Sequence, residues 1–239
     1  MAGLAAKIHK WLALLMALQI LFWFVSGLFF AVFPIERVRS EHRLAKASPA
    51  PLDLTRTLSA SEAASRAGLP APASALLKST PSGPVWVITP AEGEPKTINA
   101  VSGEPARTLG EAHARALAAR AYAGSGRPVA ARYYAEAPKE TGRQGPLWRV
   151  DFDDAEGTAF YLEPRTGEVV TRRSDVWRFY DFFWRLHILD FDEGDDFNHP
   201  LLIGLAVLTL PVVITGFILL WIRLGRDLKA TLARRRLGG

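Results

Sequence analysis

Three histidines stand close to two long apolar segments and are the residues best suited to bind a cofactor. His9 precedes the first apolar segment, and His187 and His199 precede the second. A neutral imidazole can be an axial ligand of haem iron, and histidines on neighbouring helices can hold a porphyrin between them. The pattern therefore indicates His9, His187 and His199 as candidate ligands of a b-type haem. The alternative is an interfacial histidine that hydrogen-bonds to headgroups or backbone, and the sequence leaves this choice open.

A run of carboxylates between His187 and His199 is a candidate site for a hard cation, which prefers oxygen ligands. Its members are Asp190, Asp192, Glu193, Asp195 and Asp196. The run lacks the spacing of an EF-hand loop, and the alternative is a solvated loop that helps to set membrane topology. No HExxH, Walker or GxSxG pattern occurs, and the absence of cysteine excludes thiolate catalysis and iron–sulfur ligation. No catalytic residue is predicted.

The two apolar segments, Leu12–Phe33 and Leu201–Ile222, each run for 22 residues without a charge. A helix of that length is roughly 33 Å long, enough to cross a bilayer core. The first segment is too long for a signal peptide and lacks a small-x-small cleavage site. Basic residues follow the second segment: Arg223, Arg226, Lys229, Arg234, Arg235 and Arg236. By the positive-inside rule this tail is cytoplasmic, and two crossings place the N-terminus there as well.

The net charge of +5 is accounted for by this tail, so it indicates membrane topology and argues against binding of nucleic acid. The two histidines His9 and His187 should lie on opposite sides of the bilayer, so they cannot hold the same haem. Within the spans, Gln19 and Ser26 share one helix face. A second predicted packing face consists of Gly204, Leu208, Pro211 and Thr215. Simple anchoring, a homodimer, and docking to a membrane or periplasmic partner protein all remain open.

The region between the spans contains two similar units. Each begins with a helix-like segment and continues into strand-like runs that contain Trp86 in one unit and Trp148 in the other. Two glycines stand ten residues apart in both units, Gly93 and Gly103 in the first, Gly157 and Gly167 in the second. A glycine permits the backbone conformation that a tight turn requires. The pattern predicts a tandem α+β module in which a helix covers one face of each antiparallel sheet.

An aromatic segment, WRFYDFFWRLH, leads from the second unit to the acidic run and is predicted to be a helix at the outer membrane interface. The predicted division of the chain is a first transmembrane segment (1–34), a linker (35–57), the two units (58–106 and 107–175), the interfacial helix with the acidic loop (176–199), a second transmembrane helix (200–223) and a basic tail (224–239).

The second unit, which ends in Thr166-Gly167-Glu168, resembles a PepSY domain, and the spans resemble PepSY-associated transmembrane helices through HKW at 9–11 and ITGFILLW at 214–221. The resemblance implies two transmembrane helices plus a cystatin-like α+β module on the periplasmic side of the bacterial inner membrane. It implies a protein that presents PepSY-like modules to regulate a partner protein. It also implies an alternative, a haem-binding electron-transfer subunit linked to ferric-siderophore reduction and iron uptake. Larger relatives have four or more spans, whereas this chain has two.

Overall fold

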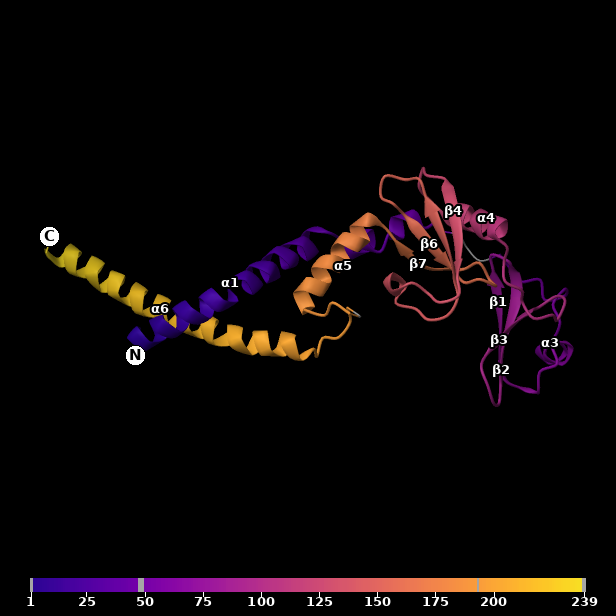
Figure 1. Ribbon diagram of the computed structural model, residues 1–239, viewed down its shortest axis with the longest axis horizontal. Helices are drawn as coiled ribbons and strands as arrows, with labels where there is room; N and C mark the ends of the chain where they lie inside the picture. Colours follow the sequence, from indigo (N-terminus) through magenta and orange to yellow (C-terminus); the bar gives the residue numbers. More distant parts are fainter. Residues whose placement is uncertain (1, 47–49, 193, 238–239) are drawn as a thin grey trace. The chain divides into compact units, whose positions relative to one another are not determined.

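The computed structural model describes residues 2–46, 50–192 and 194–237, and the chain divides into two compact units. The membrane unit consists of Met1–Phe33 together with Tyr180–Gly239, and the repeat unit is Pro34–Phe179. Figure 1 shows the long helices of the first and the sheets of the second. The predicted combination of membrane helices with an α+β domain is confirmed.

The membrane unit is built on two long helices, α1 (Ala2–Val32) and α6 (Pro200–Leu237), which are in contact with each other. They include candidate membrane spans of 30 residues, Gly3–Val32, and 34 residues, Pro200–Ala233, which are long and apolar enough to cross a membrane. Large apolar side chains point away from the protein along both helices, with Phe24 75% and Trp221 81% exposed. Such side chains are stable in hydrocarbon, so a lipid bilayer is the environment that this unit requires.

One stripe of α1 makes its contacts with the rest of the unit. Its positions are spaced alternately four and three residues apart, and its buried members include Ala5, Met16 and Ser26. This spacing keeps one face of a helix against its neighbours. The predicted face of Gln19 and Ser26 therefore belongs to the packing seam.

The packing face of α6 differs from the predicted one. Val212 and Thr215 are buried, whereas Leu208 is 40% exposed and nothing approaches the Cβ position of Gly204. Within this chain Thr215 of the predicted face is buried and Pro211 is half-buried, whereas Gly204 and Leu208 remain exposed. In a helix that is apolar all round, composition alone does not indicate which face packs.

Helix α5 (Asp175–Ile188) is the predicted aromatic helix, and it packs against the second half of α1 in the membrane unit. The ring centroids of Phe183 and Phe29 are 5.3 Å apart, and those of Tyr180 and Phe30 are 4.7 Å apart. On the other side, Phe182 remains 58% exposed. The helix therefore covers part of α1 with one aromatic face and leaves another free.

Within the repeat unit, repeat 1 contains α3 (Ala60–Arg66) and a three-stranded antiparallel sheet in the order β1 (Pro72–Thr80), β2 (Gly83–Pro90), β3 (Lys96–Asn99). Ser59 and Glu62 form a capping box that satisfies free N–H groups where α3 begins. The core of repeat 1 joins Ala63 and Ala64 of the helix to Ile88 and Ile98 of the sheet.

Repeat 2 contains α4 (Glu111–Ala121) and a four-stranded antiparallel sheet in the order β4 (Pro128–Tyr134), β5 (Leu147–Phe152), β6 (Ala159–Leu162), β7 (Val169–Arg173). Its larger core packs Leu117 of α4 on Trp148, Phe160 and neighbouring residues. Short helices α2 (Ile35–Val38) and η1 (Glu41–Arg43) precede repeat 1, and η2 (Lys139–Thr141) lies in the long β4–β5 loop.

The same hydrogen bond occurs in repeat 1 and repeat 2, which confirms that they are repeats of one fold. The indole N–H of Trp86 donates to the carbonyl of Leu58 at 2.9 Å, and that of Trp148 donates to the carbonyl of Leu109 at 3.1 Å. Each acceptor lies just before the helix of its own repeat. The tryptophan therefore fixes where the helix begins relative to the sheet.

The turn that follows the third strand is also duplicated. Gly103 N–H donates to the carbonyl of Asn99, and Gly167 N–H donates to that of Glu163. A side-chain oxygen of Asn99 or Glu163 accepts two further backbone N–H groups in the same turn. Both glycines have a positive φ, +79° and +70°. The predicted glycine-dependent turns are correct.

The first strand of each repeat was not predicted, since the segments that form β1 and β4 show no regular alternation of apolar and polar residues. The fourth strand, β7, has only a short counterpart in repeat 1. There Pro105 forms an isolated bridge with Ile98, and Ala106 N–H donates to the carbonyl of Thr97. Repeat 1 is therefore a reduced version of repeat 2.

Candidate functional site

His9 lies in the contact between the two long helices. Its Nδ1 is 3.0 Å from the carbonyl oxygen of Val212 and 3.2 Å from the hydroxyl of Thr215. Because a carbonyl oxygen can only accept, Nδ1 carries the proton and donates it. Gly216 makes room for the ring, since a Cβ there would lie 3.2 Å from a ring carbon of His9. Sequence reasoning missed Gly216, although a glycine near the middle of an apolar helix is a signal of close packing.

His187 lies at the end of α5 and is held by the stripe of α1. Its Nδ1 is 2.7 Å from the hydroxyl of Ser26, and the indole N–H of Trp23 donates to its carbonyl oxygen at 2.8 Å. Since the Ser26 hydroxyl donates its own proton to the carbonyl of Phe22, it accepts from Nδ1–H of His187. The Ser26–His187–Trp23 contact therefore fastens α5 to α1.

In both histidines, Nδ1–H is taken by a protein oxygen, and Nε2 has no hydrogen-bond partner among the residues that the structure describes. This tautomer leaves the Nε2 lone pair free to bind a metal, as in many metal-ligating histidines. However, Ser26 and His9 are 17 positions apart on α1, roughly 25 Å along the helix axis. His9 and His187 are therefore far apart in the structure, and their separation agrees with the prediction from the membrane topology.

His199 has a different role in the structure. Its Nδ1 accepts a hydrogen bond from the backbone N–H of Leu201 at 3.3 Å, and its carbonyl accepts from Ile203 N–H at 3.2 Å. It thus caps the beginning of α6. Because Nδ1 is the acceptor, the proton of the neutral ring sits on Nε2, which is then not available as a ligand. The structure does not place His199 beside His187 or His9 in any described contact.

The acidic run forms an ordered loop around one of its own carboxylates. The side chain of Asp190 accepts hydrogen bonds of 2.8–3.1 Å from four backbone N–H groups, those of Asp192, Gly194, Asp195 and Asp196. These backbone bonds lower the pKa of Asp190 to about 2. The indole N–H of Trp184 donates to the carbonyl of Gly194, which ties the loop to α5.

The loop is therefore organised by backbone groups. Among the described residues, no three acidic or histidine side chains are grouped as a metal would require. Glu193, one of the five predicted ligands, lies outside the described residues. The cation site stays a prediction.

The Thr166–Gly167–Glu168 turn joins the two repeats. The backbone N–H of Ser82, in the β1–β2 turn, donates to the carbonyl of Thr166 at 3.1 Å. Lys78 forms an ion pair of 2.9 Å with the carboxylate of Glu168. The motif that carries the family resemblance thus holds repeat 1 against repeat 2, a role that its sequence pattern did not indicate.

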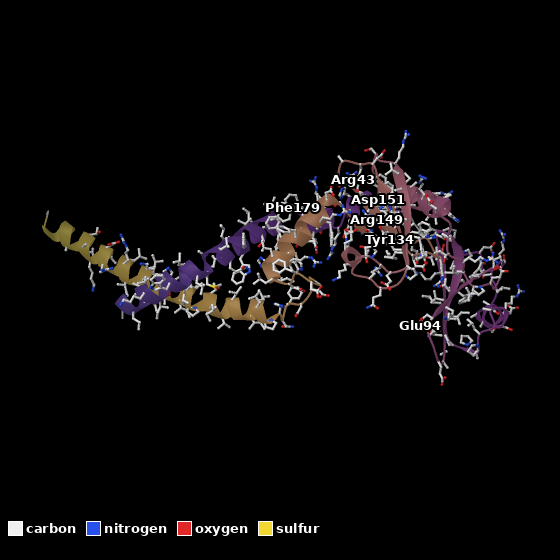
Figure 2. All side chains as sticks on the ribbon, in the orientation of Figure 1. Arg43, Glu94, Tyr134, Arg149, Asp151 and Phe179 are labelled. Carbon is white, nitrogen blue, oxygen red and sulfur yellow. The ribbon has the colours of Figure 1, made fainter. Side chains whose placement is uncertain are left out.

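The outer sheet faces, which point away from α3 and α4, differ sharply between the repeats. In repeat 2 the β4–β5 loop covers this face, and Glu140 in that loop binds Arg149, Arg178 and the hydroxyl of Tyr161. Burial and the bond to Glu140 raise the pKa of Tyr161, which is fully buried. Figure 2 labels Arg149 and its second partner, Asp151, on β5.

In repeat 1 the corresponding connection is only the two-residue turn between Thr80 and Gly83, so this repeat has no loop of its own over the outer face. Val85 of this face is nevertheless buried. This face is formed by Leu76, Val87 and Thr97, which are paired across the three strands. Leu76 is 59% exposed, and Val87 and Thr97 are half-buried. Repeat 1 therefore presents a largely apolar sheet face that is accessible around Leu76, Val87 and Thr97.

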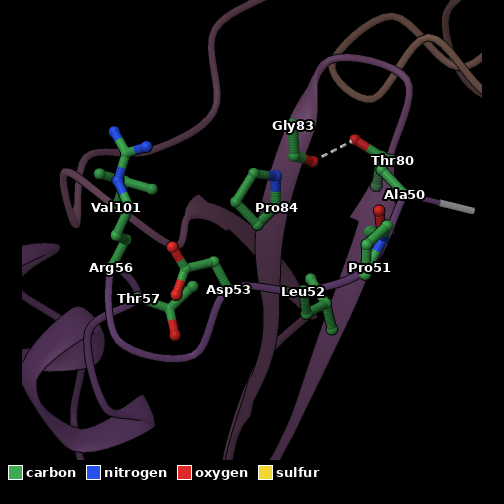
Figure 3. Close-up of a pocket in the computed structure, with 11 residues that line it drawn as sticks. Ala50, Pro51, Leu52, Asp53, Arg56, Thr57, Thr80, Gly83, Pro84 and Val101 are labelled. Carbon is green, nitrogen blue, oxygen red and sulfur yellow. Dashed lines mark hydrogen bonds between the residues drawn. The ribbon is translucent and has the colours of Figure 1, made fainter.

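A cavity of about 290 Å³ lies at one end of the same sheet. It is bounded by the linker residues Leu52, Asp53 and Arg56 and by Pro84 and Val101 (Figure 3). The dashed bond in Figure 3, from the hydroxyl of Thr80 to the carbonyl of Gly83, holds the turn beside it.

A polar cluster ties the segment after α1 to repeat 2. Asp154 accepts from the hydroxyls of Tyr122 and Thr158, both at 2.6 Å, and Arg43 binds Glu156 at 3.1 Å. Burial, followed by the bond to Asp154, raises the pKa of Tyr122 to about 12. Every member is satisfied by another, which indicates a structural network.

The family model described as the PepSY-associated TM region matches residues 6–239, nearly the entire chain. No curated protein and no solved structure matches the chain.

Proposed function

Because the chain belongs to the family of PepSY-associated TM regions, we propose that it is anchored in the bacterial inner membrane and presents its two repeats on the periplasmic side, where they bind and regulate a partner protein. The partner is a second copy of the chain or another membrane or periplasmic protein. The predicted domain boundaries are part of this proposal. The observation that carries it is the accessible outer sheet face of repeat 1.

The contrast between the repeats supports this role. One fold occurs twice, and only one copy has its outer sheet face covered by its own loop. The covered face contains the charged Arg149 and the tyrosine Tyr161, whereas Val87 and Thr97 occupy the same positions in repeat 1. Side chains of this kind lose little solvation when a partner covers them, so the face of repeat 1 is suited to contact with protein.

The proposed orientation rests on charge. The basic residues after Ile222 remain in the cytoplasm, and the acidic loop before α6 faces the periplasm. A C-terminal reporter that is active only in the cytoplasm supports this orientation. Activity only in the periplasm contradicts it.

Photo-crosslinking from the sheet tests partner binding. A photoreactive amino acid at Val87 or Thr97 of the full-length protein should give adducts of one defined mass in intact cells. Arg132, on the exposed edge strand of repeat 2, is the matched control and should give none. The same adducts from Arg132, or no adduct from repeat 1, contradict the proposal.

The alternative function, electron transfer through b-type haem linked to ferric-siderophore reduction, is supported by the tautomers of His9 and His187. Each ring has Nδ1–H engaged by a protein oxygen and a free Nε2, as an axial ligand needs. When bound, haem would supply one-electron transfer. Each ring would need a second ligand from another chain, because the two are too far apart to share one group.

An absorption spectrum of the detergent-purified protein, expressed with ample haem, tests this alternative. A Soret band that is lost in His187→Ala or His9→Ala and kept in His199→Ala supports it. His199 is the control because its Nδ1 is used in capping α6. A colourless protein contradicts the alternative and leaves partner binding intact.

A further inference from the structure

Strand β1 is the outer strand of repeat 1 and has nine residues, more than any other strand that the structure describes. Its two-residue turn to β2 makes Thr80 and Gly83 a hydrogen-bonded pair. Because every second residue of an antiparallel strand bonds to the same neighbour, Lys78 and Leu76 also direct their backbone N–H and C=O groups toward β2. The intervening residues, Ala75 and Leu77, direct their N–H and C=O groups outward. Neither has a backbone hydrogen bond on this side with any described residue. The edge therefore has free donors and acceptors.

The other edge strands of the described sheets are protected. Beside β3, the segment 104–106 occupies the outer edge through the bridge of Pro105 to Ile98 and the hydrogen bond from Ala106 N–H to the carbonyl of Thr97. Strand β7 contains Arg172 and Arg173 and an irregular register, and β4 contains Arg132. Charges and irregularities of this kind are the usual means by which sheet edges avoid pairing with other strands.

Strand β1 lacks this protection over its central part. From Pro72 to Leu77 it contains no charge, and the register irregularity is confined to its first residues, between Pro72 and Ser74. Lys78 is occupied by its ion pair with Glu168. An exposed, uncharged and regular edge is a template for another strand.

The sequence of this edge is complementary to itself. If two copies pair antiparallel about a two-fold axis at Leu76, Leu76 faces its own copy, Ala75 faces Leu77, and Ser74 faces Lys78. The pairing sets Ala75 against Leu77, places no like charges directly opposite each other, and brings the two Leu76 side chains, each 59% exposed, into contact. It also gives four hydrogen bonds, because Ala75 and Leu77 exchange both of theirs across the axis.

We propose that two copies of this protein associate through β1, which joins their three-stranded sheets into one six-stranded sheet. A single pair of strands is marginally stable in water. Confinement of both copies to one bilayer raises their effective concentration, and this compensates for the small contact. The pairing is one form of partner binding and so rests on the proposed function, but the two can fail separately.

Disulfide cross-linking in native membranes tests the pairing. Because the protein has no cysteine of its own, an introduced cysteine is the only residue of this chain that can form the disulfide. In the full-length protein, Leu76→Cys should form a disulfide-linked dimer under mild oxidation, because directly opposed residues of a non-hydrogen-bonded pair lie about 4.5 Å apart. The matched control is Val129→Cys, on edge strand β4 and 54% exposed. We expect at least tenfold more dimer from Leu76→Cys than from Val129→Cys.

A second substitution separates strand pairing from chance collision. Ala75→Pro removes only an N–H group that points outward, so β1 keeps its bonds to β2, and the Leu76→Cys dimer should be lost. Ala75→Lys adds a charge at the edge without changing the backbone and should have the same effect. Equal cross-linking at Leu76 and Val129, or a dimer that survives both substitutions, overturns the pairing. Adducts of Leu76→Cys with a different protein also overturn it, while they support partner binding as such.

Discussion

The turn that joins the repeats should be unusually sensitive to a single methyl group at Gly167. This residue has φ of +70°, and a Cβ there would lie 2.2 Å from Cδ1 of Leu117 in the core of repeat 2. The left-handed backbone alone costs an alanine about 1–2 kcal/mol. Forcing a methyl group into a packed core costs about 1–3 kcal/mol more. We therefore expect Gly167→Ala to destabilise repeat 2 by about 2–5 kcal/mol.

Gly142 of the same repeat provides the matched control. Its φ is +62°, but nothing lies within 4 Å of its Cβ position. Gly142→Ala should therefore show only the backbone cost of about 1–2 kcal/mol. The difference between the two variants isolates the contact with Leu117.

Hydrogen exchange of the α4 amides, measured by mass spectrometry on the full-length protein in detergent, reports the local free energy of opening. Each 1.4 kcal/mol is a tenfold change in exchange rate. Combining Gly167→Ala with Leu117→Ala should recover about 1–3 kcal/mol relative to the sum of the single variants, because the shortened side chain no longer meets the methyl group. If Gly167→Ala costs no more than Gly142→Ala, or if the pair is additive, the tight packing of this turn on α4 is refuted.

Three further predictions concern single side chains. Ser26→Ala removes the acceptor for His187 and should destabilise the attachment of α5 by about 1 kcal/mol, visible as faster exchange across α5 with no change in β6. Asp190→Asn should open the acidic loop at neutral pH. In the natural protein, the stabilisation of the loop by Asp190 should be complete above about pH 4 and lost as the pH falls toward 2, because the pKa of Asp190 is lowered in the folded state. A protection of the loop amides from exchange that does not change over this pH range contradicts the prediction. Tyr122→Phe should remove the phenol that titrates near pH 12 in absorbance at 295 nm. Because the folded pKa of Tyr122 is raised, its stabilising effect is present below about pH 10 and is lost toward pH 12.

The repeat architecture could be predicted from the sequence because its markers have local causes. Trp86 and Trp148 each occupy the same position beside a helix start, and Gly103 and Gly167 each supply a positive φ that other residues adopt only at a cost. Such requirements depend on nearby backbone geometry and leave a visible trace in the residue type.

Features that depend on distant contacts left no such trace. The first strands were missed because β1 has no regular alternation of apolar and polar residues and is exposed along much of its length, so that its pairing with β2 defines it as a strand. The accessible face of repeat 1 depends on the length of one connection, and the pairing of Lys78 with Glu168 depends on how two repeats dock. The positions of His9 and His187 near span boundaries were visible, whereas their bonds to Val212 and Ser26 required the structure.

The single contact stripe of α1 has a mechanical consequence. His9 near one end meets α6, and Ser26 toward the other end meets α5, so both contacts depend on the same angular setting of one helix. A rotation of α1 about its axis by one residue, about 100°, would break the contact of His9 with α6 and the contact of Ser26 with α5 at the same time. A slide of one helical turn would replace Ser26 with Phe22 or Phe30, neither of which has a hydroxyl group. The two contacts together therefore fix both the rotation of α1 about its axis and its position along that axis.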